Sequence, residues 1–237
     1  MTLALHYAPE NAIRFEDSII SRFENPATSY VIEFWHTDQC LVVPLSMANR
    51  SSHSEACQQM QASGWPVVVR RTGGGVTPQG PGIVNVAVAY APDPVESPTV
   101  QGVYEFFCTP PVRALKQVGL DAGTSSVRGS FCDGKYNVVV AERKVMGTAQ
   151  RWTRIRSTHV RRVVFAHALI LLDADISAAA DAINRFYRIS GVDCSIRDVV
   201  HENVFSLARE QGFCVDQNQF VNALSKLYAS ELDALTG

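Results

Sequence analysis

The residues best suited to bind a charged ligand lie in one stretch, residues 67–90. Two arginines, Arg70 and Arg71, follow a β-branched run and precede Thr72 and the glycines Gly73, Gly74 and Gly75. Glycine has no Cβ and tolerates positive φ, so backbone N–H groups of such a loop can approach a ligand closely. Guanidinium groups beside the loop suit a phosphate or carboxylate. The stretch predicts an anion-binding site between two strands, although a plain glycine-rich turn has the same composition.

The elements around this loop predict an α+β fold, a mixed β-sheet with packed helices. Apolar spacing predicts helices over residues 9–24, 53–63 and 99–118, with Pro110 and Pro111 breaking or restarting the third. Strands are expected at 30–35, 40–43 and on both sides of the glycine loop. A hairpin over 136–147 turns near Ala141 and Glu142, and a central strand follows at 160–172. Asp175 caps the next helix, and Asp216 with Gln219 begins the last one.

Composition excludes several classes of protein. The 237 residues have a net charge of −2 and 46% hydrophobic content, which indicates a globular chain and neither a nucleic-acid nor a membrane partner. The N-terminus lacks the pattern of a signal peptide. Six cysteines without a Cys-x-x-Cys pair argue against zinc or a disulfide scaffold, so we expect reduced thiols, no metal ligands and a cytoplasmic location. A single domain over residues 1–237 is expected.

The loop itself is neither a Walker loop nor a dinucleotide-binding loop, because no Gly-Lys-Ser/Thr and no Gly-x-Gly-x-x-Gly is present. Arg-Arg-Thr-Gly-Gly-Gly, followed about ten residues later by an Asn and an apolar strand, resembles the lipoate-binding loop of the biotin/lipoate protein ligase superfamily. The resemblance implies a class II synthetase-like catalytic domain. It also implies that Arg70, Arg71, Thr72, Gly73, Gly74, Gly75 and Thr77 shape the ligand pocket.

Two further motifs carry the same resemblance. The segment from Glu142 to Arg151 is similar to the family's Gly-Arg-Lys-Ile-x-Gly-Ser-Ala-Gln-Arg, which implies that Lys144 is the catalytic lysine that holds the acyl carbonyl and that Gly147 and Thr148 bind the ligand. A fixed ammonium there would stabilise the charge that develops on an attacked carbonyl. The segment from Phe165 to Asp173 resembles His-Gly-Thr/Ser-Leu-Leu-Leu-Asp and places His167 and Ala168 at the ligand. An exposed hairpin lysine and a core histidine are the structural alternatives.

The chain departs from the ligase pattern at residues that matter for ATP. The His and Asp that usually follow the glycines are Gln79 and Gly80 here, and Asn137, which the resemblance places at the ligand, stands where an acidic residue is expected. Loss of these carboxylates weakens the case for Mg-ATP. Five arginines surround the loop between the hairpin and the third motif: Arg151, Arg154, Arg156, Arg161 and Arg162. They would dock an acidic carrier domain or the ligand's phosphate, or else lie in a solvated loop.

Two cysteines are candidate nucleophiles if the reaction is an ATP-independent transfer. Cys132 precedes Tyr136, as the nucleophile of one octanoyltransferase group precedes its Tyr-Glu-Leu strand; Cys194 is a weaker rival, and either could be an inert thiol. Pairing of Lys144 with Val139 would put the lysine roughly 23 Å from Cys132 along an extended chain. The two can meet only if residues 129–134 fold back, which Gly129 and Gly134 permit.

The resemblance implies a lipoate-protein ligase-like enzyme that activates lipoate or octanoate with ATP and Mg²⁺ as acyl-AMP. It would then transfer the acyl group to a lysine of a lipoyl-domain or other acyl-carrier protein. One alternative is an ATP-independent octanoyltransferase with a cysteine thioester. Another is a catalytically silent binder of a lipoate-like ligand or of the carrier.

Overall fold

Seven strands form the main sheet, in the order β1-β2-β6-β10-β9-β8-β7. The computed structural model describes residues 3–71, 73–92, 98–156 and 160–236, without the side chains of 156, 160, 161 and 236. The strands are β1 (Leu5–Tyr7), β2 (Tyr30–Thr37), β6 (Ile83–Tyr90), β7 (Ala122–Ser125), β8 (Asn137–Val140), β9 (Arg143–Arg156) and β10 (Val160–Leu171). The pair β1–β2 is parallel and the other pairs are antiparallel. The predicted mixed sheet is confirmed, and β10 lies at its centre.

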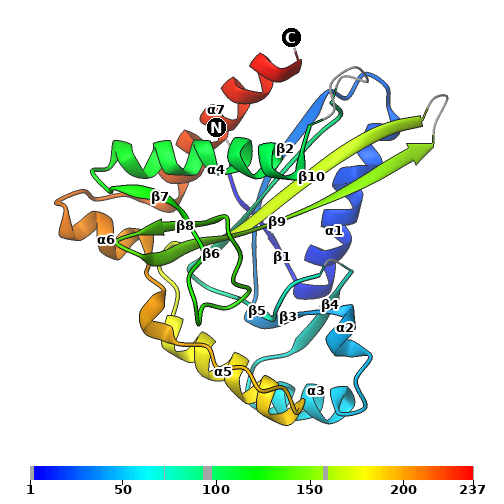
Figure 1. Cartoon of the computed structure of the whole chain (residues 1–237), viewed down its shortest axis with the longest axis vertical. Coiled ribbons are helices and arrows are strands. Elements are labelled where there is room, and N and C mark those ends of the chain that lie inside the picture. The colour runs from blue at the N-terminus through cyan, green and yellow to red at the C-terminus, as the bar shows by residue number, and fades with distance from the viewer. Residues whose placement is uncertain (1–2, 72, 93–97, 157–159, 237) are drawn as a thin grey trace.

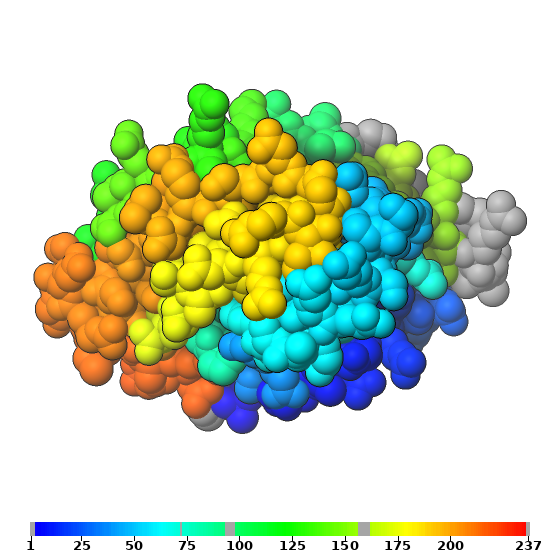
Figure 2. All heavy atoms as spheres, turned by 90° about the horizontal axis from the view of Figure 1, so that it is seen from below, coloured from blue at the N-terminus to red at the C-terminus, as the bar shows by residue number. Residues whose placement is uncertain are grey.

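A second sheet of three strands has the order β4-β3-β5. Its strands are β3 (Cys40–Pro44), β4 (Val67–Arg70) and β5 (Thr77–Gln79). The glycine loop connects β4 to β5, two strands that lie on opposite sides of β3. The short helices α2 (Leu45–Ala48) and α3 (His53–Ala62) follow β3, and α3 packs against α5 (Ile176–Ile189), as Figure 2 shows on the underside of the molecule.

The two faces of the main sheet are covered by different helices (Figure 1). Side chains alternate along a strand, and in β6 Val84, Val86 and Val88 join the core under α4 (Val100–Gln117), α6 (Val204–Glu210) and α7 (Gln217–Thr236). Ala87 and Ala89 face the opposite way and pack with α1 (Pro9–Ser21), which a 3₁₀ turn extends over Arg22–Glu24. The helix predicted at 9–24 is therefore confirmed, and it covers the face that carries the candidate site.

The prediction that Pro110 and Pro111 interrupt the third helix is wrong. α4 runs unbroken from Val100 to Gln117 with both prolines inside it. Pro111 has no N–H for the carbonyl of Phe107, four residues earlier. The buried hydroxyl of Tyr228 in α7 donates to that oxygen instead, at 2.9 Å, and its ring stacks on Phe107. A tertiary contact 121 residues away thus replaces the missing helical hydrogen bond.

The predicted hairpin is confirmed, and its second strand is longer than expected. Ala141 and Glu142 both adopt positive φ, as a tight two-residue turn between β8 and β9 requires. β9 then continues to Arg156 and pairs with β10 from Val160, so Arg151 and Arg154 belong to a long hairpin and not to a loop. This hairpin extends beyond the other strands in Figure 1.

Candidate active site

A cavity lies between the main sheet, α1 and the three-stranded sheet. Leu169 of β10 pairs with Asn85 of β6 and Gly147 of β9, so these three positions form one row on the sheet face below α1. His167 belongs to the next row on the same face, two residues along β10. The cavity is lined from β2 by Trp35 and Thr37, from β4 and β5 by Arg70, Thr77 and Gln79, and from the loop before β8 by Phe131 and Cys132. Strands far apart in sequence therefore meet around one chamber.

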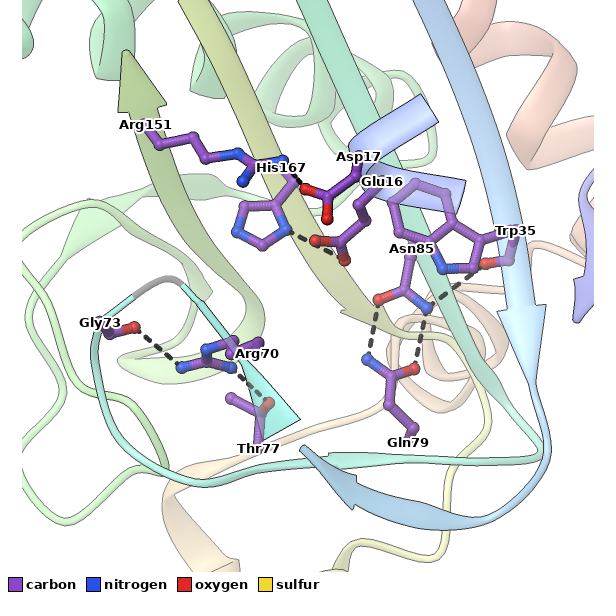
Figure 3. Close-up of polar contacts among 10 residues, drawn as sticks. All are labelled: Glu16, Asp17, Trp35, Arg70, Gly73, Thr77, Gln79, Asn85, Arg151 and His167. Atoms are coloured by element: carbon purple, nitrogen blue, oxygen red, sulfur yellow. Dashed lines mark hydrogen bonds and ion pairs between the residues drawn. The ribbon is translucent and has the colours of Figure 1, made fainter. Parts of the chain in front are cut away.

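Arg70 holds the glycine loop in a closed shape. Its guanidinium is buried and donates to the carbonyl of Gly73 at 3.1 Å and to the hydroxyl of Thr77 at 2.9 Å (Figure 3). It also donates to the carbonyl of Gly75 at 2.7 Å. Five-donor guanidinium geometry suits this multiple bonding. Arg70 therefore builds the loop, and its Nε is buried without a hydrogen-bond partner in the described residues.

Cys132 lies against this loop. Its Sγ accepts the backbone N–H of Gly75 at 3.4 Å and lies 3.9 Å from Nη2 of Arg70. Gly74 has φ +104°, and a Cβ there would stand 2.8 Å from the same sulfur. A larger residue at position 74 would displace the thiol, so the absence of a side chain at Gly74 makes the contact possible.

Residues 126–136 fold back toward the hairpin, as the meeting of Cys132 with Lys144 requires. Gly129 and Cys132 both have positive φ. A carboxylate oxygen of Asp133 accepts the N–H of Val127 at 2.7 Å and the side-chain amide of Asn137 at 2.9 Å. Asn137 also donates to the carbonyl of Gly134 at 2.8 Å. Asn137 was expected to contact the ligand. In the structure its side chain is buried and supports the loop that carries Cys132.

Lys144 is buried at this junction, 1% exposed, and is not an exposed hairpin lysine. It pairs with Val139, as expected, and its Nζ donates to the carbonyl of Phe131 at 2.6 Å and to that of Cys132 at 3.2 Å. Burial lowers the pKa of Lys144 to about 8, against the opposing effects of Cys132 and Asp133. A Cβ at Gly147 would stand 2.9 Å from Cε of this lysine. Gly147 therefore leaves room for the amine.

The part of the cavity near β6 and α1 carries polar groups whose pairing the sequence did not predict. Gln79 and Asn85 exchange two hydrogen bonds of 2.8 Å through their buried amides (Figure 3). Nδ1 of His167 lies 3.6 Å from a carboxylate oxygen of Glu16, and Nε2 is buried without a partner among the described residues. The sequence indicated His167 through its motif and Gln79 as the replacement of an expected His, but it gave no sign of the contact with Glu16.

The remaining candidates are distributed unevenly. Thr148 and Ala168 line the cavity, and Thr148 also donates to the carbonyl of Tyr136 at 2.8 Å. Arg71 and Gly73 are exposed and are not among the described residues that line the cavity, and Thr72 lies outside the described residues. These positions remain predictions.

A second, open hollow meets the first cavity at Cys132. It is lined by the glycine loop, the Cys132 loop and the segment after α5, including Gly75, Arg128, Asp133, Tyr187, Cys194 and Arg197. Cys194 is exposed on the far wall, while Cys132 is half-buried and belongs to both cavities. Of the two candidate thiols, only Cys132 lines the chamber that contains Lys144.

Within the described chain, no three His, Cys, Asp or Glu side chains gather in a way that would hold a metal ion. No helix in the described residues is long and apolar enough to span a bilayer.

Comparison with known proteins identifies the family. The model of the lipoyl protein ligase A/B catalytic domain matches residues 8–229. An uncharacterised protein of Cupriavidus necator is 36% identical over 164 residues, 64% of the chain and 65% of that protein. An octanoyl-[GcvH]:protein N-octanoyltransferase of Kyrpidia tusciae is 32% identical over 156 residues, 65% of the chain and 54% of that protein. The chain thus matches less than two thirds of the length of either relative.

The fold agrees with this result. A lipoate-protein ligase A bound with ATP aligns with a TM-score of 0.71 and 19% identity over 98% of the chain and 85% of that structure, which shows a shared fold. A putative lipoate protein ligase of T. acidophilum with bound lipoic acid gives 0.69 and 18%, over 98% of the chain and 84% of that structure. The chain therefore belongs to the lipoyl protein ligase A/B catalytic domain family, as the three motifs indicated.

Proposed function

We propose that the chain is an acyltransferase that moves an octanoyl or lipoyl group between carrier domains through a thioester on Cys132, without ATP. The observation that carries the proposal is the position of Cys132, whose sulfur contacts Gly75 N–H while its own carbonyl accepts Lys144 Nζ. This placement reverses the preference for a ligase drawn from the sequence. The relative from Kyrpidia tusciae, named an octanoyltransferase acting on GcvH, is consistent with it.

In the first half-reaction, the Cys132 thiolate attacks the carbonyl carbon of the acyl group on the donor carrier's lysine. The carbon–nitrogen bond breaks, the lysine nitrogen takes a proton from the ammonium of Lys144 and leaves as an amine, and the acyl group remains on sulfur. The N–H of Gly75 and the guanidinium of Arg70 contact the sulfur and hold it beside the glycine loop. The half-reaction needs no cofactor.

In the second half-reaction, the acceptor carrier's lysine attacks the thioester and Cys132 leaves as thiolate. Charge accumulates on the acyl oxygen in both steps, and a preorganised donor there lowers the barrier. We assign this donor to Lys144, because the carbonyls of Phe131 and Cys132 bind two of its three protons and leave the third for the acyl oxygen. Its pKa of about 8 also lets it exchange a proton with the incoming amine near neutral pH.

The two cavities give the acyl chain and the carrier separate places. The chamber below α1 takes the acyl chain, since apolar side chains line much of it: Ala12, Ile13, Trp35 and Leu169. The polar pairs Gln79–Asn85 and His167–Glu16 line the rest of this part. The open hollow lined by Arg128 and Arg197 admits the carrier's lysine arm. Cys132 lines both, so the two substrates meet at its sulfur.

The ligase route stays the competing hypothesis. It would use ATP and Mg²⁺, yet Gly80 and Asn137 replace the expected carboxylates, and the amide of Asn137 is already bound to Asp133 and Gly134. Transfer without ATP makes no demand on these positions. The proposal therefore accounts for the departures as well as for Cys132.

The test uses an octanoylated carrier domain as donor and an unmodified carrier domain as acceptor, without ATP, followed by intact mass. We expect the parent and Cys194→Ser to transfer the acyl group and to show a hydroxylamine-sensitive adduct on the Cys132 peptide. Cys132→Ser should lose transfer by about a thousandfold or more. ATP-dependent attachment of free octanoate or lipoate by both the parent and Cys132→Ser would establish the ligase route instead, and absence of both activities would leave a silent binder.

A further inference from the structure

The stretch of chain between α5 and α6 reaches the active site from behind. A 3₁₀ turn at Asp198–Val200 precedes His201, whose side chain is buried at 3% exposure. The imidazole stacks on Phe131 with ring centroids 4.2 Å apart and an angle of 8° between the planes. Phe131 directly precedes Cys132, so His201 packs on the residue next to the proposed nucleophile.

Both ring nitrogens of His201 are engaged. Nδ1 lies 3.0 Å from the carbonyl of Arg197, and Nε2 accepts the backbone N–H of Phe131 at 3.2 Å. A carbonyl can only accept and an N–H can only donate, so these partners require the neutral tautomer with its proton on Nδ1. Burial and then the charge of Lys144 lower the pKa of His201 to about 4, which keeps it neutral at physiological pH.

The same segment also holds the backbone of Lys144. Lys144 and His201 form a parallel bridge, and the N–H of Glu202 donates to the carbonyl of Lys144 at 3.0 Å. The side chain of Lys144 in turn bonds the carbonyls of Phe131 and Cys132, and its Nζ lies 4.9 Å from the centre of the Phe131 ring. Residues 201 and 202 thus contact both sides of the Cys132–Lys144 pair.

Further contacts fix the other end of the Cys132 loop to this segment. The N–H of Arg197 donates to the carbonyl of Gly129 at 2.9 Å, and Nη2 of Arg197 donates to the carbonyl of Arg128 at 2.7 Å. The hydrogen bond from the N–H of Phe131 to His201 is the next anchor along the loop, and the bond from Lys144 to the carbonyl of Phe131 follows it. Because Cys132 has positive φ, its conformation depends on such anchors.

We propose that His201 is a positioning residue for the acyl transfer. Its neutral ring fixes the peptide between Ser130 and Phe131 and packs on the Phe131 side chain, so that the thiol of Cys132 and the amine of Lys144 face the same chamber. His201 lies behind Phe131 and is not among the described residues that line either cavity, so it acts through these two groups. The inference rests on the proposed function where acyl transfer is measured. The rate of Cys132 alkylation depends only on the geometry of the loop.

Two matched variants separate the two hydrogen bonds. In His201→Gln the side-chain carbonyl can stand where Nε2 stands, three bonds from Cβ, and can still accept the N–H of Phe131. In His201→Asn the shorter amide can reach the carbonyl of Arg197 but not Phe131. Both variants are polar and remove the aromatic ring, so the stacking contact is lost equally in each.

Transfer kinetics and alkylation of Cys132 by iodoacetamide, followed on the Cys132 peptide at one pH, provide the readouts. We expect His201→Asn to lower kcat between about 10-fold and 100-fold with KM for the carriers unchanged, the scale of a small misplacement of reacting groups. Its Cys132 alkylation rate should change, while His201→Gln stays within a few-fold of the parent in both readouts. Circular dichroism and urea unfolding give the folded fraction used to normalise both rates.

If His201→Asn and His201→Gln have the same kcat and the same Cys132 alkylation rate after this normalisation, the proposal is wrong. A histidine with only a structural role would lower the stability of both variants and would not separate their rates. If the parent shows no Cys132-dependent transfer, the proposed function fails, and the alkylation rates still decide the role of His201. The groups that face His201 and could alter its protonation are Lys144 and Asp198, with Glu202 beside it paired to Arg143.

Discussion

Replacement of Lys144 by methionine separates the contribution of the amine to catalysis from its contribution to stability. Methionine has a similar length and no charge, so Lys144→Met removes the donor at the acyl oxygen while it fills the same space. Loss of one preorganised donor lowers kcat by about 100-fold to 1,000-fold, or roughly 3 to 4 kcal/mol of transition-state stabilisation. We expect acyl transfer by Lys144→Met to fall by this amount with the fold intact.

The stability of the variant follows from two opposing effects. Burial lowers the pKa of Lys144 from its ordinary value of 10.5 to about 8, which corresponds to a destabilisation on the order of 3 kcal/mol while the amine is charged. Methionine removes that penalty but leaves the carbonyls of Phe131 and Cys132 without this donor, at about 1 to 3 kcal/mol each. The net change in the free energy of unfolding at pH 7 should therefore lie between a gain of about 1 kcal/mol and a loss of about 3 kcal/mol.

The pH dependence gives the sign of the effect. Between pH 8 and 10.5 the unfolded lysine keeps a proton that the folded one has lost, so this group makes the parent more stable as pH rises, by about 2 kcal/mol at pH 9.5. Urea unfolding at pH 7 and pH 9.5 should show this gain in the parent relative to Lys144→Met. Transfer at the parent rate, or the same pH dependence in both proteins, would refute the assignment of Lys144.

Three further changes test the loop and the helix. Gly74→Ala should reduce Cys132-dependent transfer at least about tenfold, because positive φ and a Cβ 2.8 Å from the sulfur both oppose it. Gly123→Ala in β7, with nothing within 4 Å of its Cβ, is the control and should match the parent in the same assay. Gly147→Ala should lower kcat by displacing the amine of Lys144, and unchanged kinetics would contradict the contact. Tyr228→Phe should reduce the free energy of unfolding by about 1 to 3 kcal/mol in urea titrations, because the carbonyl of Phe107 loses its donor.

The fold was predictable where local signals and tertiary structure agree. The turn at Ala141 and Glu142, the apolar stripe of α1 and the buried run of β10 are each read from a few neighbouring residues. The continuous α4 was not predictable from the sequence. Its prolines are tolerated because the hydroxyl of Tyr228 donates to the carbonyl of Phe107, which has lost its helical partner. A rule that considers only the residues next to a proline cannot predict a hydrogen-bond partner so distant in the sequence.

The site was predictable only in part, for the same reason. The sequence pattern placed Lys144 in a hairpin, but the distance between Lys144 and Cys132 depends on the path of residues 126–136. The glycines in this segment allow it to fold back but do not determine that it does. His201 carried no signal, since an isolated histidine in a loop has no pattern. Its role follows from stacking on Phe131 and from the two hydrogen bonds that fix its tautomer.

The replacement at position 137 links the loss of a carboxylate to the presence of the nucleophile. Asn137 donates its amide to Asp133 and to the carbonyl of Gly134, and both bonds stabilise the loop that presents Cys132. An acidic residue there has no proton to donate at neutral pH and would place a second negative charge against Asp133. The loop observed here therefore depends on an amide at a position where the ligase pattern has an acid. A single residue choice both removes a carboxylate suited to Mg²⁺ and supports the cysteine that makes ATP unnecessary in the proposed reaction.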